Sequence, residues 1–301
     1  MNILFMGSPA IAQTILANLC AQYIPVAVVT QRAKPFGRGR HIQPTPVEQY
    51  AKTNSLDVLA VDNVNDPKVI KQLKQYNLDL ILVAAFGQIL KQELLQLPRH
   101  FCLNVHASLL PQYRGAAPIQ WAIWNGDKVT GITIQKMTRK LDAGDILLKK
   151  ELAIRPDDTS ETLTEHLACL GGKCLIEAVK LVETGHPSFT SQKEELATYA
   201  RKIERSDAPI DWNNPADRIL NQIRALVPWP VAETNLKKDP LKIFRAEKRA
   251  GFANSPPGTL HTDSRSFLAF QCGDEMALCL LEVQQANRKK LPITEFLRGY
   301  R

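Results

Sequence analysis

The 301-residue sequence predicts an α/β protein, with a Rossmann-like parallel sheet in its first part and a small β-barrel or sandwich in its second. Two observations support this prediction. In the first part, short apolar segments alternate with segments that carry apolar residues at helical spacing, which is typical of a parallel sheet covered by helices. Beyond about residue 209, short strand-like segments are separated by turns such as Pro228-Trp229-Pro230. A chain of this length also favours two domains over one core.

The expected elements follow one another along the chain. Apolar residues 2–6 predict a strand, and the tight turn that follows leads into a helix. We expect further strands at 26–30, 79–86, 102–106, 131–137 and 146–153, and helices at 10–22, 45–54, 66–76 and 159–184. Residues 186–208 lose helical periodicity. We therefore place one domain at 1–189, a linker at 190–208 and a second domain at 209–301.

Composition and simple motifs argue against several classes of protein. The turn that begins at Gly7 lacks the later glycines of a dinucleotide-binding loop, so we expect no NAD. No apolar run is long enough to span a membrane, and residues 1–5 resemble a strand more than a signal peptide, so we expect a cytoplasmic protein without membrane contact. The six cysteines form no C-x-x-C pair, and we expect no metal. No long apolar stripe calls for a partner, so we expect a monomer.

Asn104 and His106 form the first candidate for chemistry. On a strand they project to the same face, near the carboxyl end where parallel sheets bind ligands. An amide can donate to a developing oxyanion, and an imidazole can carry a proton near neutral pH. A hydrogen-bonded core histidine is the competing interpretation. A carboxylate from the turn 141–146 could orient His106, but spacing does not decide between Asp142 and Asp145.

The motifs around these residues resemble the folate-dependent formyltransferase family. The resemblance covers nearly the whole chain in the family's order. It rests on N-V-H-A-S-L-L-P-Q-Y-R-G-A-A-P-I-Q at 104–120, L-D-A-G-D at 141–145, F-M-G-S-P at 5–9, P-F-G-R-G-R at 35–40, P-T-P-V at 44–47, A-A-F-G-Q-I-L at 84–90, I-D-W at 210–212 and R-A-L-V-P-W-P at 224–230. The G-R-G loop and the W-P region point to the branch that acts on tRNA.

Carried over residue by residue, the resemblance implies a formyltransferase domain with Asn104, His106 and Asp142 as the catalytic set. It implies 10-formyltetrahydrofolate as the formyl donor, bound by two segments and without a metal. The implied folate contacts are Ser108, Leu109, Leu110 and Pro111, with the backbone of Phe86, Gly87, Gln88 and Ile89. The acceptor it implies is the α-amino group of methionyl-initiator tRNA, which attacks the formyl carbon directly.

Basic residues suit a polyanionic partner such as tRNA. The net charge is +8, and residues 1–47 contain no Asp or Glu. The resemblance places the loop 31–44, with Arg38 and Arg40, at the acceptor stem, and implies that the second domain is an OB-like barrel that binds tRNA. Lys202 and Arg205 precede the I-D-W motif, where family members commonly carry lysine at the position of Arg205. The barrel's basic residues are further candidates: Lys237, Lys238, Lys242, Arg245, Lys248, Arg249, Arg288, Lys289 and Lys290. We expect Trp121 and Trp124, at i,i+3 spacing, to pack in the core.

Other functions remain open from the residues. A purine-pathway formyltransferase would not need the second domain, and a sugar-nucleotide formyltransferase would not need the G-R-G loop. A non-catalytic RNA-binding protein with this fold would have no reason to keep Asn104, His106 and Asp142 together. The acceptor therefore depends on the basic loop and the barrel rather than on the catalytic residues.

Overall fold

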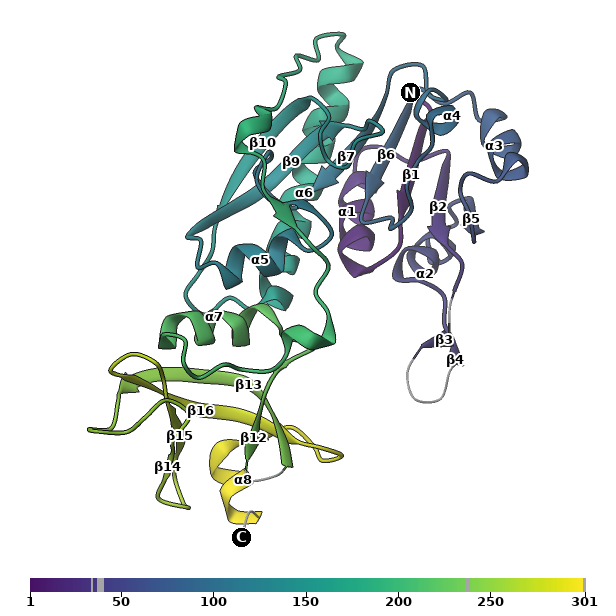
Figure 1. Ribbon diagram of the computed structural model, residues 1–301. Helices are drawn as coiled ribbons and strands as arrows, with labels where there is room; N and C mark the ends of the chain where they lie inside the picture. Colours follow the sequence, from purple (N-terminus) through teal and green to yellow (C-terminus); the bar gives the residue numbers. More distant parts are fainter. Residues whose placement is uncertain (34, 37–40, 237–238, 300–301) are drawn as a thin grey trace. The chain divides into compact units, whose positions relative to one another are not determined.

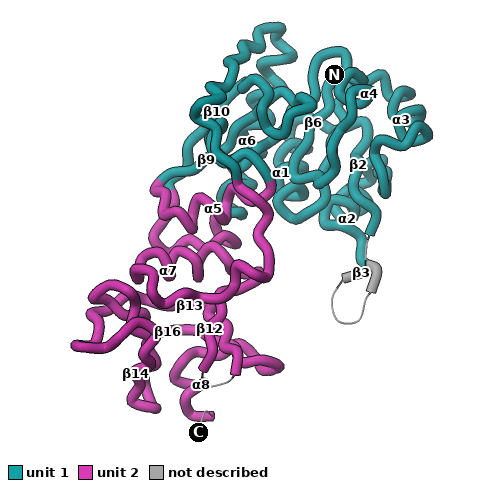
Figure 2. The backbone as a smooth tube through the Cα atoms, viewed as in Figure 1, with its two compact units in different colours: residues 1–115, 129–153, 164–199 teal, residues 116–128, 154–163, 200–301 magenta. Residues whose placement is uncertain are grey.

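The computed structural model describes residues 1–33, 35–36, 41–236 and 239–299. The chain forms two compact units, coloured separately in Figure 2. The first unit comprises residues 1–115, 129–153 and 164–199, and the second comprises residues 116–128, 154–163 and 200–301. Each unit is therefore assembled from segments that are distant in sequence.

A seven-stranded sheet with the order β10-β9-β7-β6-β1-β2-β5 forms the first unit (Figure 1). Its strands are β1 (Ile3–Gly7), β2 (Ala27–Gln31), β5 (Val58–Val61), β6 (Leu80–Ala84), β7 (Phe101–His106), β9 (Val129–Lys136) and β10 (Ile146–Ala153). The predicted parallel sheet is present in five of these strands, whereas β9 pairs antiparallel with both of its neighbours, β7 and β10. The turn of residues 137–145 between β9 and β10 is too short for the crossover that a parallel pair requires.

Five helices of the first unit cover this sheet, and all but α4 lie at predicted positions. They are α1 (Ala10–Cys20), α2 (Pro46–Thr53), α3 (Pro67–Lys74), the short α4 (Gln92–Leu95) and α6 (Ser160–Glu183). The side chains of Thr45 and Asp66 cap α2 and α3 by accepting backbone N–H bonds, and a proline follows each cap. The central strands β1 and β6 are buried along their whole length, which explains their unbroken apolar sequence.

The strand order of the sheet reverses between β1 and β6. The chain adds β2 and β5 on one side of β1 and then β6 and β7 on the other. Gly7 at the end of β1 pairs with Ala84 at the end of β6, and a Cβ on Gly7 would lie 2.9 Å from the Ala84 carbonyl oxygen. Glycine is required by this close approach. Ligands of such sheets bind outside the carboxyl ends of the strands at this reversal.

The second unit is built on an antiparallel sheet that curls, as predicted for an OB-like domain (Figure 1). Its strands are β12 (Ala232–Leu236), β13 (Asp239–Ala250), β14 (Leu260–Thr262), β15 (Leu268–Gln271), β16 (Met276–Gln285) and β17 (Leu291–Pro292). Three helices join it: α5 (Pro118–Trp124), α7 (Ala216–Ala225) and α8 (Ile293–Gly299). The short strands expected beyond residue 209 are present, and the helices α7 and α8 there were not predicted. In α7, the buried Ala216, Ile219 and Ile223 follow a helical period that the surrounding turns obscured.

Short elements complete the chain. They are the β3 (Pro35–Phe36), β4 (His41–Ile42), β8 (Arg114–Gly115) and β11 (Tyr199–Ala200) strands and the 3-10 helices η1 (Glu194–Leu196) and η2 (Arg205–Asp207). Trp121 and Trp124 stack with ring centroids 5.2 Å apart and pack, partly buried, against the core of the second unit, as expected. Within the described ranges, none of the helices combines the length and the apolar character needed to cross a bilayer.

Candidate active site

Strand β7 presents Asn104 and His106 at the carboxyl end of the first unit's sheet. The two residues alternate with buried Val105, and they pair in register with Gln135 and Thr133 of β9. His106 is only 6% exposed. Asn104 is partly buried, and its side-chain amide forms no hydrogen bond with any part of the chain that the structure describes. Its amide is therefore available to a bound molecule.

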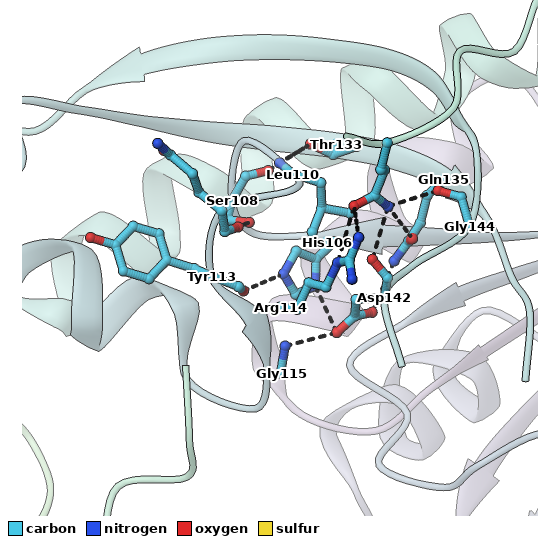
Figure 3. Close-up of polar contacts among 12 residues, drawn as sticks. His106, Ser108, Leu110, Tyr113, Arg114, Gly115, Thr133, Gln135, Asp142 and Gly144 are labelled. Carbon is cyan, nitrogen blue, oxygen red and sulfur yellow. Dashed lines mark hydrogen bonds and ion pairs between the residues drawn. The ribbon is translucent and has the colours of Figure 1, made fainter. Parts of the chain in front are cut away.

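Both ring nitrogens of His106 face oxygen atoms (Figure 3). Nδ1 lies 3.6 Å from Oδ2 of Asp142, and Nε2 lies 2.9 Å from the carbonyl oxygen of Tyr113. Because a carbonyl oxygen only accepts hydrogen bonds, Nε2 carries the hydrogen of this contact. A second hydrogen on Nδ1 would then point toward the carboxylate. At 3.6 Å the carboxylate lies close enough to orient the ring electrostatically, although the two atoms are not hydrogen-bonded.

Asp142 is fixed independently of His106. Its Oδ1 accepts a 2.9 Å bond from Nε2 of Gln135, and its Oδ2 accepts a 2.9 Å bond from the backbone N–H of Gly115. The backbone of Asp142 adopts a positive φ of 48°, which aspartate tolerates better than most residues. The competing carboxylate, Asp145, instead accepts a bond from the hydroxyl of Ser191. Of the two carboxylates, Asp142 is the one that reaches His106.

Gly144 allows this turn to pack directly on β9. A Cβ at Gly144 would lie 1.7 Å from the carbonyl oxygen of Lys136, so no other residue fits without moving the turn. The backbone N–H of Lys136 also donates to the Asp145 carbonyl at 2.9 Å. The glycine of the L-D-A-G-D motif therefore sets how close Asp142 can lie to the sheet.

The loop that follows β7 holds its shape by internal hydrogen bonds. The Ser108 hydroxyl donates to the Gln112 carbonyl at 2.6 Å, and the Thr133 hydroxyl bridges the Ser108 carbonyl and the Leu110 N–H at 2.7 and 3.1 Å. The side chains of Ser108 and Leu110 are completely buried, whereas Leu109 and Pro111 are partly exposed. Of these four residues, Leu109 and Pro111 can therefore offer side chains to a ligand.

The turn after β6 exposes backbone and one apolar side chain. Phe86 is buried, Gly87 is exposed with a φ of 78°, and Ile89 is 78% exposed. The side chain of Gln31 donates to the Phe86 carbonyl at 2.6 Å, and the side chain of Gln88 accepts from the Val64 N–H at 2.8 Å. Exposed backbone beside an apolar side chain suits a flat heteroaromatic ligand, which needs both hydrogen-bonding groups and an apolar contact.

Sequence reasoning missed three residues that hold the site together. Gln135 is a buried polar residue in the largely apolar β9. Arg114 is only 1% exposed, although arginine side chains are rarely buried so completely. The side chain of Gln192 joins the Asp142 turn to Arg114. Gln135 carried a detectable signal, since it interrupts an apolar strand, and Arg114 is one of only two fixed positive charges between residues 94 and 126. Gln192 carried no signal at all.

Next to the His106–Asp142 pair, the site contains an ion pair between Arg114 and Glu194. Arg114 donates to both carboxylate oxygens of Glu194 at 3.0 and 2.9 Å. These bonds raise the pKa of Arg114 and lower the pKa of Glu194 from its ordinary value. Burial raises the pKa of Cys102, near the start of β7, to about 12, which leaves it an inert thiol. Within the described residues, no group of three or more His, Cys, Asp or Glu side chains is placed to hold a metal ion.

The predicted tRNA contacts lie in two places. Arg38 and Arg40, with Lys237 and Lys238 of the barrel, fall outside the described residues. Lys202 and Arg205 are exposed in the second unit, and no described residue forms an ion pair with either side chain. Two other barrel lysines are already paired, Lys248 with Asp217 at 2.6 Å and Lys290 with Glu282 at 3.1 Å.

Known proteins resemble this chain in sequence and in fold. Residues 1–179 match the formyl transferase family, and residues 202–301 match the formyl transferase C-terminal domain. The chain belongs to the formyl transferase family. One family relative is the methionyl-tRNA formyltransferase of Caldanaerobacter subterraneus subsp. tengcongensis, 46% identical over 100% of this chain and 97% of that protein. The methionyl-tRNA formyltransferase of Bacillus subtilis is 42% identical over 99% of this chain and 94% of that protein.

Fold similarity extends to solved structures that are much less similar in sequence. An N-formyltransferase from Helicobacter canadensis, crystallised with folinic acid and dTDP-3-aminofucose, has a TM-score of 0.70 at 17% identity, over 95% of this chain and 99% of that one. At such low identity the likeness concerns the fold only. The fold of this formyl transferase therefore does not decide which amine it formylates.

Proposed function

We propose that this chain transfers a formyl group from 10-formyltetrahydrofolate to the α-amino group of methionyl-initiator tRNA. The observation that carries the proposal is the free amide of Asn104 next to a buried His106 that Asp142 holds. Sequence identity of 42–46% with methionyl-tRNA formyltransferases over nearly the full chain supports the choice of acceptor. Residues 1–189 would carry catalysis, residues 190–208 would link, and residues 209–301 would bind tRNA.

The chemistry proceeds by direct transfer in this proposal. The unprotonated amine attacks the formyl carbon, forming a new C–N bond and placing negative charge on the formyl oxygen. The Asn104 amide donates to this oxygen and stabilises the tetrahedral intermediate. When the bond from carbon to the folate nitrogen breaks, the proton lost by the amine moves to that nitrogen. His106, oriented by Asp142, assists the proton transfer.

The folate would bind where the structure exposes suitable groups. Leu109 and Pro111 of one loop and the backbone around Gly87 of the other supply apolar contact and hydrogen-bonding atoms. Ser108, Leu110 and Phe86 are buried, so their contribution is to shape these loops rather than to touch the donor. Gln88 and Ile89 complete the proposed folate segment.

The tRNA would be held by exposed basic residues. Lys202 and Arg205 have free charged groups, and the loop 31–44 contributes Arg38 and Arg40. Electrostatic attraction to phosphates needs no fixed geometry in the free protein, so exposure and charge are what this role requires. We also propose that the enzyme is cytoplasmic and monomeric.

A panel of acceptors tests the proposal. Purified protein is mixed with 10-formyltetrahydrofolate that carries a labelled formyl group, and with charged initiator tRNA, uncharged tRNA or an amino-sugar nucleotide. We expect label on the charged tRNA alone, since it offers the methionyl amine. Label on the amino sugar would overturn the acceptor and leave the formyl chemistry intact. Absence of label on every acceptor would overturn the function.

A further inference from the structure

Gln192 bridges the two segments that enclose His106. Its Nε2 donates to the backbone carbonyls of Asp142 and Gly144 at 2.9 and 2.7 Å, and its Oε1 accepts from Nε and an Nη of Arg114 at 3.2 and 3.0 Å. We propose that Gln192 is a positioning residue, which fixes Asp142 against His106 during formyl transfer. The inference rests on the proposed function, and it adds a residue from the segment expected to be a linker.

The Asp142 turn needs a partner from outside itself. Asp142 has a left-handed backbone, and its carbonyl and that of Gly144 are both capped by the same Gln192 amide. The neighbouring residues reinforce this contact. Thr190 and Ile146 exchange two backbone hydrogen bonds of 2.8 and 2.9 Å, and Ser191 bonds to Asp145. Residues 190–192 therefore lie along the turn and hold its backbone in place.

The other end of the Gln192 side chain fixes the loop that faces His106. A buried guanidinium must have acceptors for its N–H groups, and Gln192 and Glu194 supply them for Arg114. The peptide groups on either side of Arg114 contact the site. The Tyr113 carbonyl faces His106 Nε2, and the Gly115 N–H donates to Asp142 Oδ2. Holding Arg114 thus holds both flanking contacts.

The orientation of the Gln192 amide follows from its partners. Carbonyl oxygens only accept and a guanidinium only donates, so the amide nitrogen must face the turn and the amide oxygen must face Arg114. Gln192→Glu would keep the contact with Arg114 but would place an oxygen against two carbonyls. Gln192→Met would keep the length of the side chain and lose both contacts. The two variants therefore separate support of the turn from support of the loop.

Asn2 provides a matched control in the same unit. Its side-chain amide also donates to two backbone carbonyls, those of Tyr76 and Asn77, at 3.0 and 3.2 Å. It precedes β1 and so lies at the amino end of the strand, opposite the carboxyl end that carries the site. Asn2→Leu therefore removes an equivalent pair of hydrogen bonds without touching the proposed machinery.

The test measures kcat and KM for formylation of charged initiator tRNA, together with the NMR resonance of the His106 Nε2–H, identified by its loss in His106→Ala. We expect Gln192→Met and Gln192→Glu to lower kcat roughly tenfold to a hundredfold, as misplacement of a catalytic group does. In both Gln192 variants we expect the KM for charged tRNA to stay near its wild-type value. In Gln192→Met the His106 Nε2–H resonance should shift or vanish. Asn2→Leu should match wild type in kcat, KM and resonance.

An unchanged kcat in a folded Gln192→Glu would overturn the inference. A loss of activity that appears only as a higher KM would overturn it as well. Should Gln192→Met fail to fold, Gln192→Glu decides the question, since it keeps the bonds to Arg114. Failure of the proposed function looks different. In that case wild-type protein formylates no charged tRNA. A different His106 Nε2–H resonance in wild type and in Gln192→Met would still show that Gln192 positions the groups around His106.

Discussion

The Asp142 turn and the exposed basic segment around Lys202 are organised in opposite ways. In the turn, the Asp142 carboxylate accepts bonds from Gln135 and Gly115 and faces His106. Lys202 and Arg205 reach into solvent without an ion-pair partner among the described residues. The difference suggests a division of labour under the proposed function: the geometry of the proposed catalytic group is fixed before a substrate arrives, whereas the proposed basic contacts would be arranged by the RNA as it binds. Changes in the turn should therefore alter kcat, and changes in the basic segment should alter KM.

The largest expected effect is that of His106→Ala. It removes the proposed proton carrier, and we expect kcat to fall at least about a hundredfold, the scale of losing one preorganised catalytic group. The KM for charged tRNA should change little. Steady-state formylation assays measure both quantities, and near-normal kcat in the purified variant would remove His106 from the mechanism.

Replacing Asp142 by asparagine should have the next largest effect. The change keeps the size of the side chain but removes the charge that faces His106. An asparagine side chain has one accepting oxygen, so it can keep only one of the two hydrogen bonds that Gln135 and Gly115 donate to Asp142. We expect kcat to fall roughly tenfold to a hundredfold, which corresponds to losing a hydrogen bond to a charged group. Asp145→Asn is the matched control, since Asp145 bonds to Ser191 and not to His106. Equal losses in the two variants would refute the special role of Asp142.

Smaller effects are expected from Lys202→Ala and Arg205→Ala. Each should raise KM for charged tRNA a few-fold and leave kcat unchanged. If each side chain contacts one phosphate, the slope of log affinity against log salt should become shallower by about 0.7 to 0.9 per variant. Lys71→Ala, on the exposed face of α3, serves as the control. A salt slope identical to wild type would show that neither residue contacts the RNA backbone. Arg38→Ala should act in the same way, with a raised KM.

The smallest effect concerns the Arg114–Glu194 ion pair and its dependence on pH. The pKa of Glu194 is lower in the folded protein than its ordinary value of 4.5, so the pair stabilises the fold above that pH. This stabilisation is lost as pH falls through the lowered pKa. The stability difference between wild type and Glu194→Gln should therefore be present at pH 7 and vanish in acid. Denaturant titrations at several pH values test this, and a difference that grows in acid would contradict it.

The sequence predicted the fold well because the relevant patterns are local. Buried strands such as β6 appear as unbroken apolar runs, and α2 and α3 begin with a capping residue and a proline. Helix α7 was missed because turns on both sides conceal its period. The antiparallel edge of the first sheet was missed because the direction of β9 depends on the connections before and after it, not on the sequence of the strand itself.

The candidate site was predictable only in part. Asn104 and His106 share a face by strand geometry, so their proximity follows from the sequence. Spacing alone could not separate Asp142 from Asp145, because the distinction depends on Gly144 allowing the turn to approach β9, and only the family resemblance favoured Asp142. Gln192 could not have been found, since it contacts the site from 50 residues beyond Asp142. Contacts of that kind exist only in the folded chain.

The measurement that tests the central claim most directly is a single-turnover transfer of labelled formyl to charged initiator tRNA by wild type and by Asn104→Ala, with tRNA binding measured on the same samples. We predict that the variant binds charged tRNA as wild type does but transfers formyl at least about a hundredfold more slowly, because the oxyanion loses its amide donor. Equal transfer rates in the two proteins would contradict the assignment of the Asn104–His106 pair as the centre of the reaction.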